Sequence, residues 1–282
     1  MILFKKAAAV TEYLVSQKST GKSIGFVPTM GALHHGHISL MVRAKGENDL
    51  VVCSIFVNPA QFNDPKDLEK YPRPIEKDIE MLTGAGCDVL FLPGVNEIYP
   101  NGLDHLKAYD LGHLESFLEG ASRPGHFNGV ANVVDRFLQI VNPDRLYLGQ
   151  KDFQQVKVLE QLAKLKEYAT HIIICSILRE ENGLAMSSRN VRLTDVQREQ
   201  AAIISQTLFF VQDYYHDYLP AALKEEAIRR IETFPDAKVD YLEFCDTDSF
   251  QIIHDWKDAT HIVVVTAVMV ANVRLLDNVV IQ

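Results

Sequence analysis

The feature that most constrains the fold is the alternation of apolar, β-branched runs with amphipathic stretches along residues 23–177. The apolar runs show no polar alternation, which is typical of strands that are buried on both faces. Such strands, when they alternate with amphipathic helices, indicate βαβ units and a parallel sheet covered on both sides. We predict strands at 23–29, 50–58, 87–93, 144–150 and 171–177, and helices at 35–45, 74–86, 128–141 and 154–165.

The pattern changes near residue 180. A helical stretch follows Thr194, which forms a predicted capping box with Gln197, and another helix is predicted at 221–232. The runs "VDYLEFC", "HIVVVTAVMV" and "VRLLDNVVI" have short connections that suit an antiparallel sheet. The predicted fold class is therefore α/β: a Rossmann-like doubly wound parallel sheet over 1–180, with a smaller α+β domain over 181–282. The polar link "LREENGLAMSSRN" is a predicted hinge and cleft wall.

Composition limits the class of protein. The 282 residues are 47% hydrophobic and 23% charged, an ordinary mixture for a soluble chain with a substantial core. A formal net charge of -9 argues against a general nucleic-acid binder. The four cysteines are widely spaced and predict reduced, buried thiols. The N-terminus lacks the apolar core of a signal peptide, and no run reaches the roughly 20 apolar residues that span a membrane, so we expect a cytoplasmic protein.

Three histidines, His34, His35 and His37, stand in the stretch "FVPTMGALHHGHISL". They follow the first predicted strand of the alternation and begin its helix. Ligands bind at the carboxyl edge of open parallel sheets, and helix N-termini attract phosphate. An imidazole there can donate a hydrogen bond to an α-phosphate and stabilise charge as pyrophosphate leaves. Metal ligation is an alternative, but a third ligand and the H-E-x-x-H spacing are not evident. Packing histidines are the other alternative.

Two nucleotide motifs can be set aside. The stretch "STGKS" resembles the end of a P-loop motif, but Ser16 occupies the position of that motif's first glycine. The stretch also precedes a strand instead of following one. A G-x-G-x-x-G fingerprint is absent after that strand.

Six motifs occur in an order and spacing that resemble one family. They are "PTMGALHHGH", "SIFVNPAQF", "YPRP", "LEGASRPGHFNGV", "LGQKDFQQ" and "LAMSSRN". The chain resembles the pantoate–β-alanine ligase family, within the nucleotidyl-transferring superfamily that carries the HIGH signature. The resemblance is strong from Phe26 to Asn190 and continues weakly to "RLLDN". His35 stands where the family commonly has glutamate, so we do not expect His35 to be essential.

The resemblance implies a two-step reaction. The carboxylate of (R)-pantoate attacks the α-phosphorus of ATP, which gives pantoyl adenylate and pyrophosphate. The amine of β-alanine then attacks the acyl carbon, which releases AMP and pantothenate. The implied partners are these small molecules and Mg²⁺, with no nucleic acid and no membrane. The resemblance also implies a homodimer, and we expect the smaller domain to act as a lid.

The resemblance assigns roles to particular residues. His34, His37 and Lys151 are the predicted catalytic residues, with His37 the preferred donor and Lys151 the cation near the α- and β-phosphates. Asn58, Gln61 and Gln155 are expected at pantoate and β-alanine, because an amide both donates and accepts. The implied ATP contacts are Met30, Gly31, Ala32, Leu33, His34, His35, Gly36, His37, Arg123, His126, Gly149, Gln150, Lys151, Asp152, Leu178, Met186, Ser187, Ser188 and Arg189.

Some of these roles are finer than contact alone. Asp152 is expected to contact the ribose or to orient Lys151, and residues 187–189 to close over the leaving pyrophosphate. Arg123 and His126 are expected in a flap that reaches the γ-phosphate. Asp78 is a candidate Mg²⁺ ligand, with a solvated residue on a helix face as the alternative.

Three other functions remain as alternatives at this point. One is a nucleotidyltransferase on the same scaffold that joins a nucleotide to a phosphate ester. The others are a zinc-dependent hydrolase built on the histidines and a catalytically silent binding protein. The paired glutamines favour a small polyol acid as substrate, and Lys151 with His37 favours catalysis.

Overall fold

A computed structural model describes residues 1–63 and 65–281 of the chain. The chain divides into two compact units. The first comprises Met1–Gly149 with Gln154–Cys175, and the second comprises Gln150–Phe153 with Ser176–Gln282. The second unit thus begins a few residues before the predicted boundary at 180, and it also takes in the short segment Gln150–Phe153.

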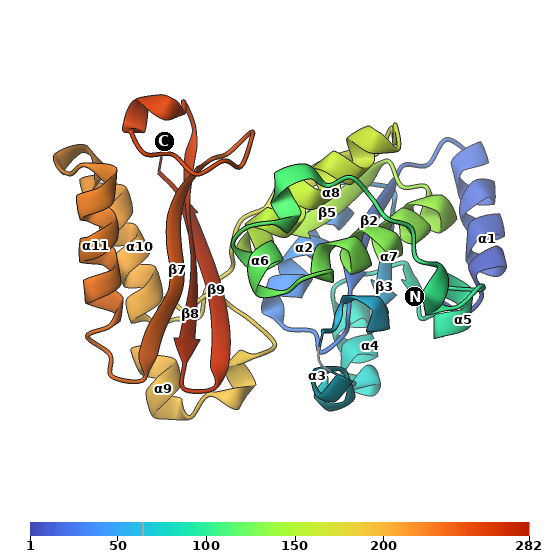
Figure 1. Cartoon of the computed structure of the whole chain (residues 1–282). Helices are drawn as coiled ribbons and strands as arrows, with labels where there is room; N and C mark the ends of the chain where they lie inside the picture. The colour runs from blue at the N-terminus through green and yellow to red at the C-terminus, as the bar shows by residue number, and fades with distance from the viewer. Residues whose placement is uncertain (64, 282) are drawn as a thin grey trace. The chain divides into compact units, whose positions relative to one another are not determined.

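The first unit is built on a six-stranded parallel sheet in the order β1-β4-β3-β2-β5-β6 (Figure 1). This confirms the predicted parallel α/β fold. Five strands match the predicted ones, and the first was not predicted because an edge strand of three residues is too short to show a period. The strands are β1 (Ile2–Phe4), β2 (Ile24–Thr29), β3 (Leu50–Ile55), β4 (Val89–Phe91), β5 (Arg145–Gly149) and β6 (His171–Cys175).

The helices of this unit include the four that the sequence predicts, α2, α4, α7 and α8. The helix predicted from residue 128 begins two residues earlier, at His126. The N-terminal helix α1 was not predicted, because weakly apolar alanines and Val15 spread around it and blur its period. The helices are α1 (Ala7–Ser19), α2 (His35–Glu47), α3 (Pro65–Lys70), α4 (Ile75–Gly84), α5 (Val95–Ile98), α6 (Glu119–Ser122), α7 (His126–Val141) and α8 (Phe153–Leu165).

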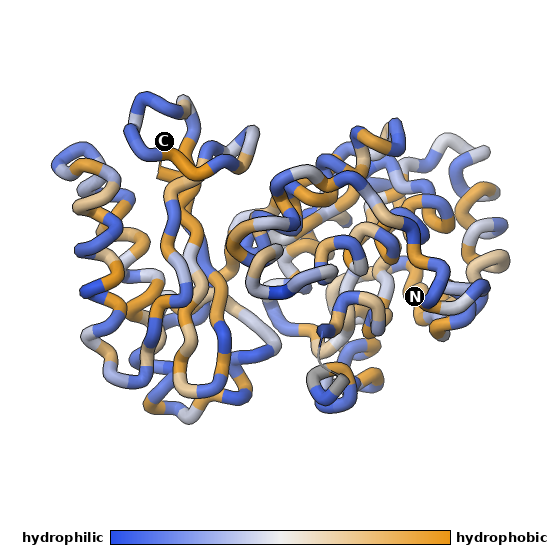
Figure 2. The backbone as a smooth tube through the Cα atoms, viewed as in Figure 1, coloured by the Kyte–Doolittle hydropathy of each residue, from blue (hydrophilic) through white to orange (hydrophobic). Residues whose placement is uncertain are grey.

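Adjacent residues of β2 send their side chains to opposite faces of the sheet. Val27 packs in one core cluster with Met41 of α2. Phe26 meets the ring of Phe137 from α7 edge to face, with 5.6 Å between ring centroids. Figure 2 shows hydrophobic and hydrophilic residues interspersed along the helices, as expected of helices with one buried side. Both faces of the sheet are therefore buried, which explains why the strand sequences are continuous apolar runs.

The order of the strands also fixes where a ligand site belongs. From β2 the chain builds outward through β3 and β4 on one side, and then returns to add β5 and β6 on the other side of β2. The strand order therefore reverses between β2 and β5. In open α/β sheets the ligand crevice lies at such a reversal, outside the carboxyl ends of the strands. The loop that follows Thr29, the last residue of β2, stands at this point.

The second unit is a three-stranded antiparallel sheet, ordered β7-β8-β9, with helices against one face (Figure 1). Thr194 and Gln197 form the predicted capping box. The helical stretch that follows is divided into two helices at residues 201–202. No helix in the described part of the chain is long and apolar enough to cross a membrane. The elements are α9 (Asp195–Gln200), α10 (Ile203–Tyr214), α11 (Pro220–Ile231), β7 (Ala237–Asp246), β8 (Ile262–Val270) and β9 (Val273–Val280).

Candidate active site

The loop between β2 and α2 carries the histidine motif and has an unusual backbone. Gly31 and Ala32 both have positive φ angles, 80° and 50°. An alanine in this region is strained, so the loop needs support from its surroundings. That support comes from Asp78 of α4, whose Oδ2 accepts a hydrogen bond from the Ala32 N–H at 2.9 Å. Its Oδ1 accepts one from the Leu33 N–H at 2.8 Å.

His34 and His37 form a reciprocal cap at the start of α2. The Nδ1 of His34 accepts from the Gly36 N–H at 3.1 Å, and the Nδ1 of His37 accepts from the His34 N–H at 3.4 Å. Their ring centroids are 4.0 Å apart. A neutral imidazole whose Nδ1 accepts a hydrogen bond carries its proton on Nε2. The loop therefore assigns both rings the tautomer with an Nε2–H donor. His35, by contrast, is exposed to solvent.

Asn58 and Gln61 lie together at the end of β3. Asn58 caps the short 3-10 helix Pro59–Gln61, Gln61 ends it, and both side chains are buried. Asn58 Nδ2 donates to Gln61 Oε1 at 3.0 Å, and Gln61 Nε2 lies 3.2 Å from the sulfur of Met30. The Tyr99 hydroxyl donates to Asn58 Oδ1 at 2.7 Å. Burial raises the pKa of Tyr99, so its phenol stays protonated and fixes the orientation of the Asn58 amide.

The same turn is held from behind by α7. Asn58 Nδ2 also donates to the carbonyl of Gly129 at 3.1 Å. A Cβ atom at Gly129 would lie 2.2 Å from the carbonyl oxygen of Ala60, so only glycine allows this close approach. The sequence motif "FNGV" therefore contains a packing requirement that its spacing alone does not reveal.

Arg123 and His126 gather around the backbone of Gln61. His126 is buried, and its Nδ1 lies 2.8 Å from the Gln61 carbonyl oxygen, which makes Nδ1 the donor. Its Nε2 lies 3.3 Å from Nη1 of Arg123 and accepts from it. The predicted role at the γ-phosphate is not tested by these contacts. They place both side chains beside the predicted pantoate residue.

Gln154 and Gln155 are adjacent on α8 but differ in their surroundings. Gln154 is buried, donates to the carbonyls of Leu114 and Phe117, and accepts from the Glu119 N–H at 3.0 Å. Gln155 is half-buried. Of the two, Gln154 is therefore committed to holding residues 114–119 in place, and Gln155 remains the predicted substrate residue.

Lys151 lies within the second unit, in the turn Gln150–Asp152 that follows Gly149. Its side chain is 16% exposed, and its Nζ lies 3.7 Å from Oδ1 of Asp152. Asn278 of β9, which is 2% exposed, donates from Nδ2 to the backbone carbonyls of Gln150 and Lys151 at 2.9 and 3.0 Å. It also accepts at Oδ1 from Gln150 Nε2. The backbone of the lysine turn is thus held by a residue that sequence reasoning did not single out.

Residues 178–190 form an ordered turn of the second unit. This turn includes the predicted ATP contacts Leu178, Met186, Ser187, Ser188 and Arg189. The Met186 N–H donates to the Leu178 carbonyl, and the Arg189 N–H donates to the Ser187 hydroxyl at 3.2 Å. Leu178 is exposed, and residues 186–189 are half-buried. Arg179, at the base of this turn, makes a bidentate ion pair with Asp277 at 2.7 and 3.0 Å. Burial raises the pKa of Asp277, and the Arg179 charge opposes that shift.

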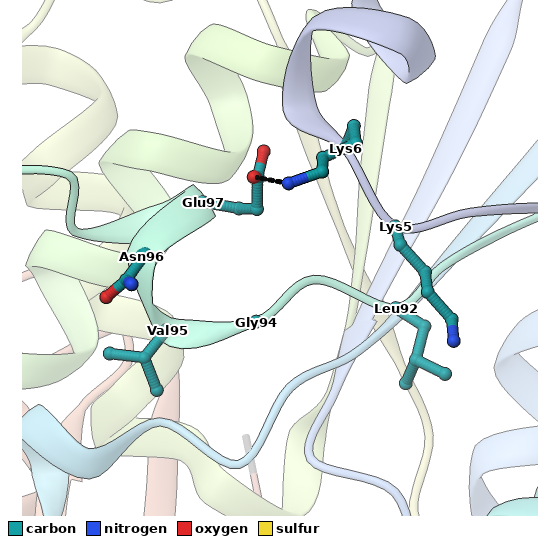
Figure 3. Close-up of a pocket in the computed structure, with 7 residues that line it drawn as sticks. All are labelled: Lys5, Lys6, Leu92, Gly94, Val95, Asn96 and Glu97. Atoms are coloured by element: carbon teal, nitrogen blue, oxygen red, sulfur yellow. Dashed lines mark hydrogen bonds and ion pairs between the residues drawn. The ribbon is translucent and has the colours of Figure 1, made fainter.

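A surface pocket of about 440 Å³ lies elsewhere on the first unit, at the ends of β1 and β4. Figure 3 shows Lys6 pointing toward Glu97 while Lys5 points away from that pair. The Nζ of Lys6 lies 2.8 Å from Oε1 of Glu97. None of its lining residues belongs to the predicted site. The sheet order places two strands, β4 and β3, between β1 and β2. Its lining residues are Lys5, Lys6, Leu92, Gly94, Val95, Asn96 and Glu97.

Within the described residues, no three His, Cys, Asp or Glu side chains are grouped so that they could hold a metal ion. Asp78 does not fit the predicted Mg²⁺ role, because its carboxylate is fully buried and each oxygen already accepts a backbone N–H. The alternative of a solvated helix-face residue is excluded by the same burial. The four cysteines are free and buried, as predicted, and burial raises the pKa of each thiol.

A family model and several known proteins match this chain over nearly its whole length. The family model described as pantoate-beta-alanine ligase matches residues 2–280. A pantothenate synthetase of Porphyromonas gingivalis is 43% identical over 279 residues, which are 99% of each chain. The pantothenate synthetase of Thermus thermophilus superposes with a TM-score of 0.91, 36% identity and 99% of each chain covered. The pantoate-β-alanine ligase of Francisella tularensis, solved in a complex with β-γ ATP and β-alanine, has a TM-score of 0.82 and 39% identity, and covers 99% of this chain and 97% of its own.

Proposed function

This chain belongs to the pantoate–β-alanine ligase family, and we propose which of its residues carry the family's reaction. It condenses (R)-pantoate with β-alanine and ATP to give pantothenate, AMP and pyrophosphate, through pantoyl adenylate. A carboxylate is a poor acylating agent, and the mixed anhydride with AMP supplies the leaving group that the amine needs. Catalysis of the first step then consists of positioning the carboxylate and stabilising charge around the phosphates.

The observation that supports this assignment most strongly is that backbone N–H groups donate to Nδ1 of both histidines, which implies the Nε2–H tautomer for each ring. With Nδ1 of His34 and of His37 occupied by backbone N–H groups, each ring has an Nε2–H to donate. A preorganised donor stabilises the charge that develops on phosphate oxygens when the bond to pyrophosphate breaks. We assign this role to His37 first and to His34 second. The exposed His35 has no catalytic part in the proposal.

Lys151 supplies the fixed positive charge in the proposed mechanism. Asn278 fixes the backbone of the turn that carries Lys151, so the conformation of this turn does not depend on contacts of the lysine side chain. Asp152, at 3.7 Å from Nζ, acts as the residue that orients Lys151. Ser187, Ser188 and Arg189 bind the leaving pyrophosphate, for which hydroxyls and a guanidinium are suitable donors.

Gln61 and Gln155 bind the hydroxyls and carboxylate of pantoate in this proposal, with Asn58 in support. Asn58 is suited to support because its amide is fixed by Tyr99 and donates to Gln61. Arg123 and His126 then act on the same pocket, by holding the Gln61 carbonyl. Their predicted role at the γ-phosphate stays a prediction beside this positioning role.

Gln61→Ala and Gln155→Ala should weaken pantoate binding more than ATP binding. Removal of one amide leaves buried polar groups unpaired, and each lost hydrogen bond is expected to cost roughly 1–3 kcal/mol. Calorimetric titration with pantoate and with ATP, each alone, measures the two affinities separately. Gln161→Ala is the matched control, because it removes a half-buried glutamine side chain from the same helix, α8. An equal loss of affinity for both ligands would assign the glutamines to the wrong pocket.

Four expectations stay predictions. They are Mg²⁺ as the companion of ATP, a homodimer, a lid role for the smaller domain, and a cytoplasmic location. Mg²⁺ commonly binds through phosphate oxygens and water, so it does not require a cage of protein ligands. The proposed roles of the residues above do not depend on an additional protein ligand for the metal.

A further inference from the structure

The backbone of the histidine loop has to be held in place before its histidines can act. Gly31 and Ala32 take the left-handed region in succession, and the second of them is not glycine. An L residue rarely adopts this conformation unless neighbouring groups impose it. The backbone N–H groups of Ala32 and of the next residue, Leu33, donate to the same carboxylate.

That carboxylate belongs to Asp78, which is separated from the loop by more than 40 residues of chain. It is fully buried, and among the described residues it forms no ion pair; the two N–H groups are its hydrogen-bond partners. A buried carboxylate is costly unless its charge is met by hydrogen bonds of this kind. The fit is tight, because a Cβ at Gly31 would lie 3.0 Å from Oδ2 of Asp78. The Asp78 carboxylate and the loop are therefore complementary in shape and in hydrogen bonding.

The support continues directly into the catalytic pair. Leu33, whose N–H is held, is followed by His34, whose own N–H caps onto Nδ1 of His37. A shift of the loop would therefore break the cap that sets the tautomer of both rings. We propose that Asp78 is a positioning residue for adenylate formation: its buried carboxylate holds the loop so that His34 and His37 keep their Nε2–H donors. This inference rests on the role proposed for the histidines above.

Asp78→Asn tests it with little change in volume. The amide keeps one acceptor, but its NH₂ group then faces a backbone N–H. Single-turnover formation of adenylate from ATP and pantoate, measured well below the melting temperature, should slow about tenfold or more. Pantoate affinity should stay within about twofold, because Gln61 lies on a different loop. Glu80→Gln removes a charge from the exposed side of the same helix and should leave the rate within about twofold.

A double-mutant cycle separates positioning from simple stabilisation. If Asp78 acts through His37, Asp78→Asn should slow the His37→Ala enzyme by less than about threefold, far less than it slows the wild type. Equal slowing in both backgrounds would show that Asp78 acts independently of the histidines and would overturn the inference. A tenfold rise in Mg²⁺ that restored the rate of Asp78→Asn would overturn it too, because that result indicates a metal ligand.

Gly31→Ala approaches the same contact from the loop and replaces Asp78→Asn if that variant does not fold. Its Cβ would press on Asp78 Oδ2, and its φ of 80° is unfavourable for alanine. The same loss of rate and the same dependence on His37 are expected, and an unaffected rate would contradict the inference. A wild-type enzyme without pantoate-dependent adenylate formation would contradict the proposed function itself. An active wild type with a normal Asp78→Asn rate would contradict only the role of Asp78.

Discussion

His37→Ala should form pantoyl adenylate roughly a hundred- to thousandfold more slowly than the wild type, which corresponds to about 2.7–4 kcal/mol of lost transition-state stabilisation. The reason is the loss of an Nε2–H donor that the loop has already oriented, at the moment when charge develops on the phosphates. The variant should fold, because the ring is only partly buried at the start of α2. Rapid-quench measurement of a single turnover with ATP and pantoate gives the rate directly.

Two companion variants assign the cause. His37→Asn places an amide oxygen where Nδ1 accepts the His34 N–H, but it lacks the Nε2–H. It should therefore be nearly as slow as His37→Ala if phosphate stabilisation is the role. A rate for His37→Asn close to wild type would mean that His37 serves only as a helix cap. His35→Glu, at the exposed neighbouring position, should stay within about twofold of the wild type.

Lys151→Ala should slow the same step by a comparable factor, on the order of a hundredfold or more, because a preorganised cation near the phosphates is lost. The backbone of the turn should survive the change, since Asn278 binds the carbonyls of Gln150 and Lys151 and not the lysine side chain. ATP affinity from calorimetry and the single-turnover rate are measured on the same preparation. Lys164→Ala, on the exposed end of α8, is the control for removal of a positive charge. A normal single-turnover rate in Lys151→Ala would contradict the role assigned to this residue.

The parallel sheet could be predicted because both of its faces are dry, so that each strand appears as a continuous apolar run between helical periods. The parts that escaped prediction are those without a local period. The edge strand β1 has three residues, and the break between α9 and α10 falls on Ala201 and Ala202, which continue a helical pattern without interruption. Such breaks are decided by packing in the second unit and not by propensity.

The candidate site divides in the same way. The histidines and the glutamines could be proposed from the sequence because they lie in motifs that resemble those of the ligase family. Asn58 and Gln61 are brought together by a local 3-10 turn. Asp78 was found as a carboxylate near a motif, but only the folded chain shows that both of its oxygens accept backbone N–H groups of the histidine loop, an arrangement that does not fit the predicted metal role. Asn278 lies 127 residues from Lys151, whose carbonyl it binds, and no local sequence pattern predicts a contact over that separation.

The most direct test of the mechanism is the exchange of labelled pyrophosphate into ATP. With ATP, Mg²⁺ and pantoate present and β-alanine absent, the enzyme should catalyse exchange, because attack at the α-phosphorus is reversible while pantoyl adenylate stays bound. Omitting pantoate should abolish the exchange, and adding β-alanine should release AMP and pantothenate. Exchange that appears only once β-alanine is supplied would contradict a mechanism in which the adenylate forms first, whatever the final product.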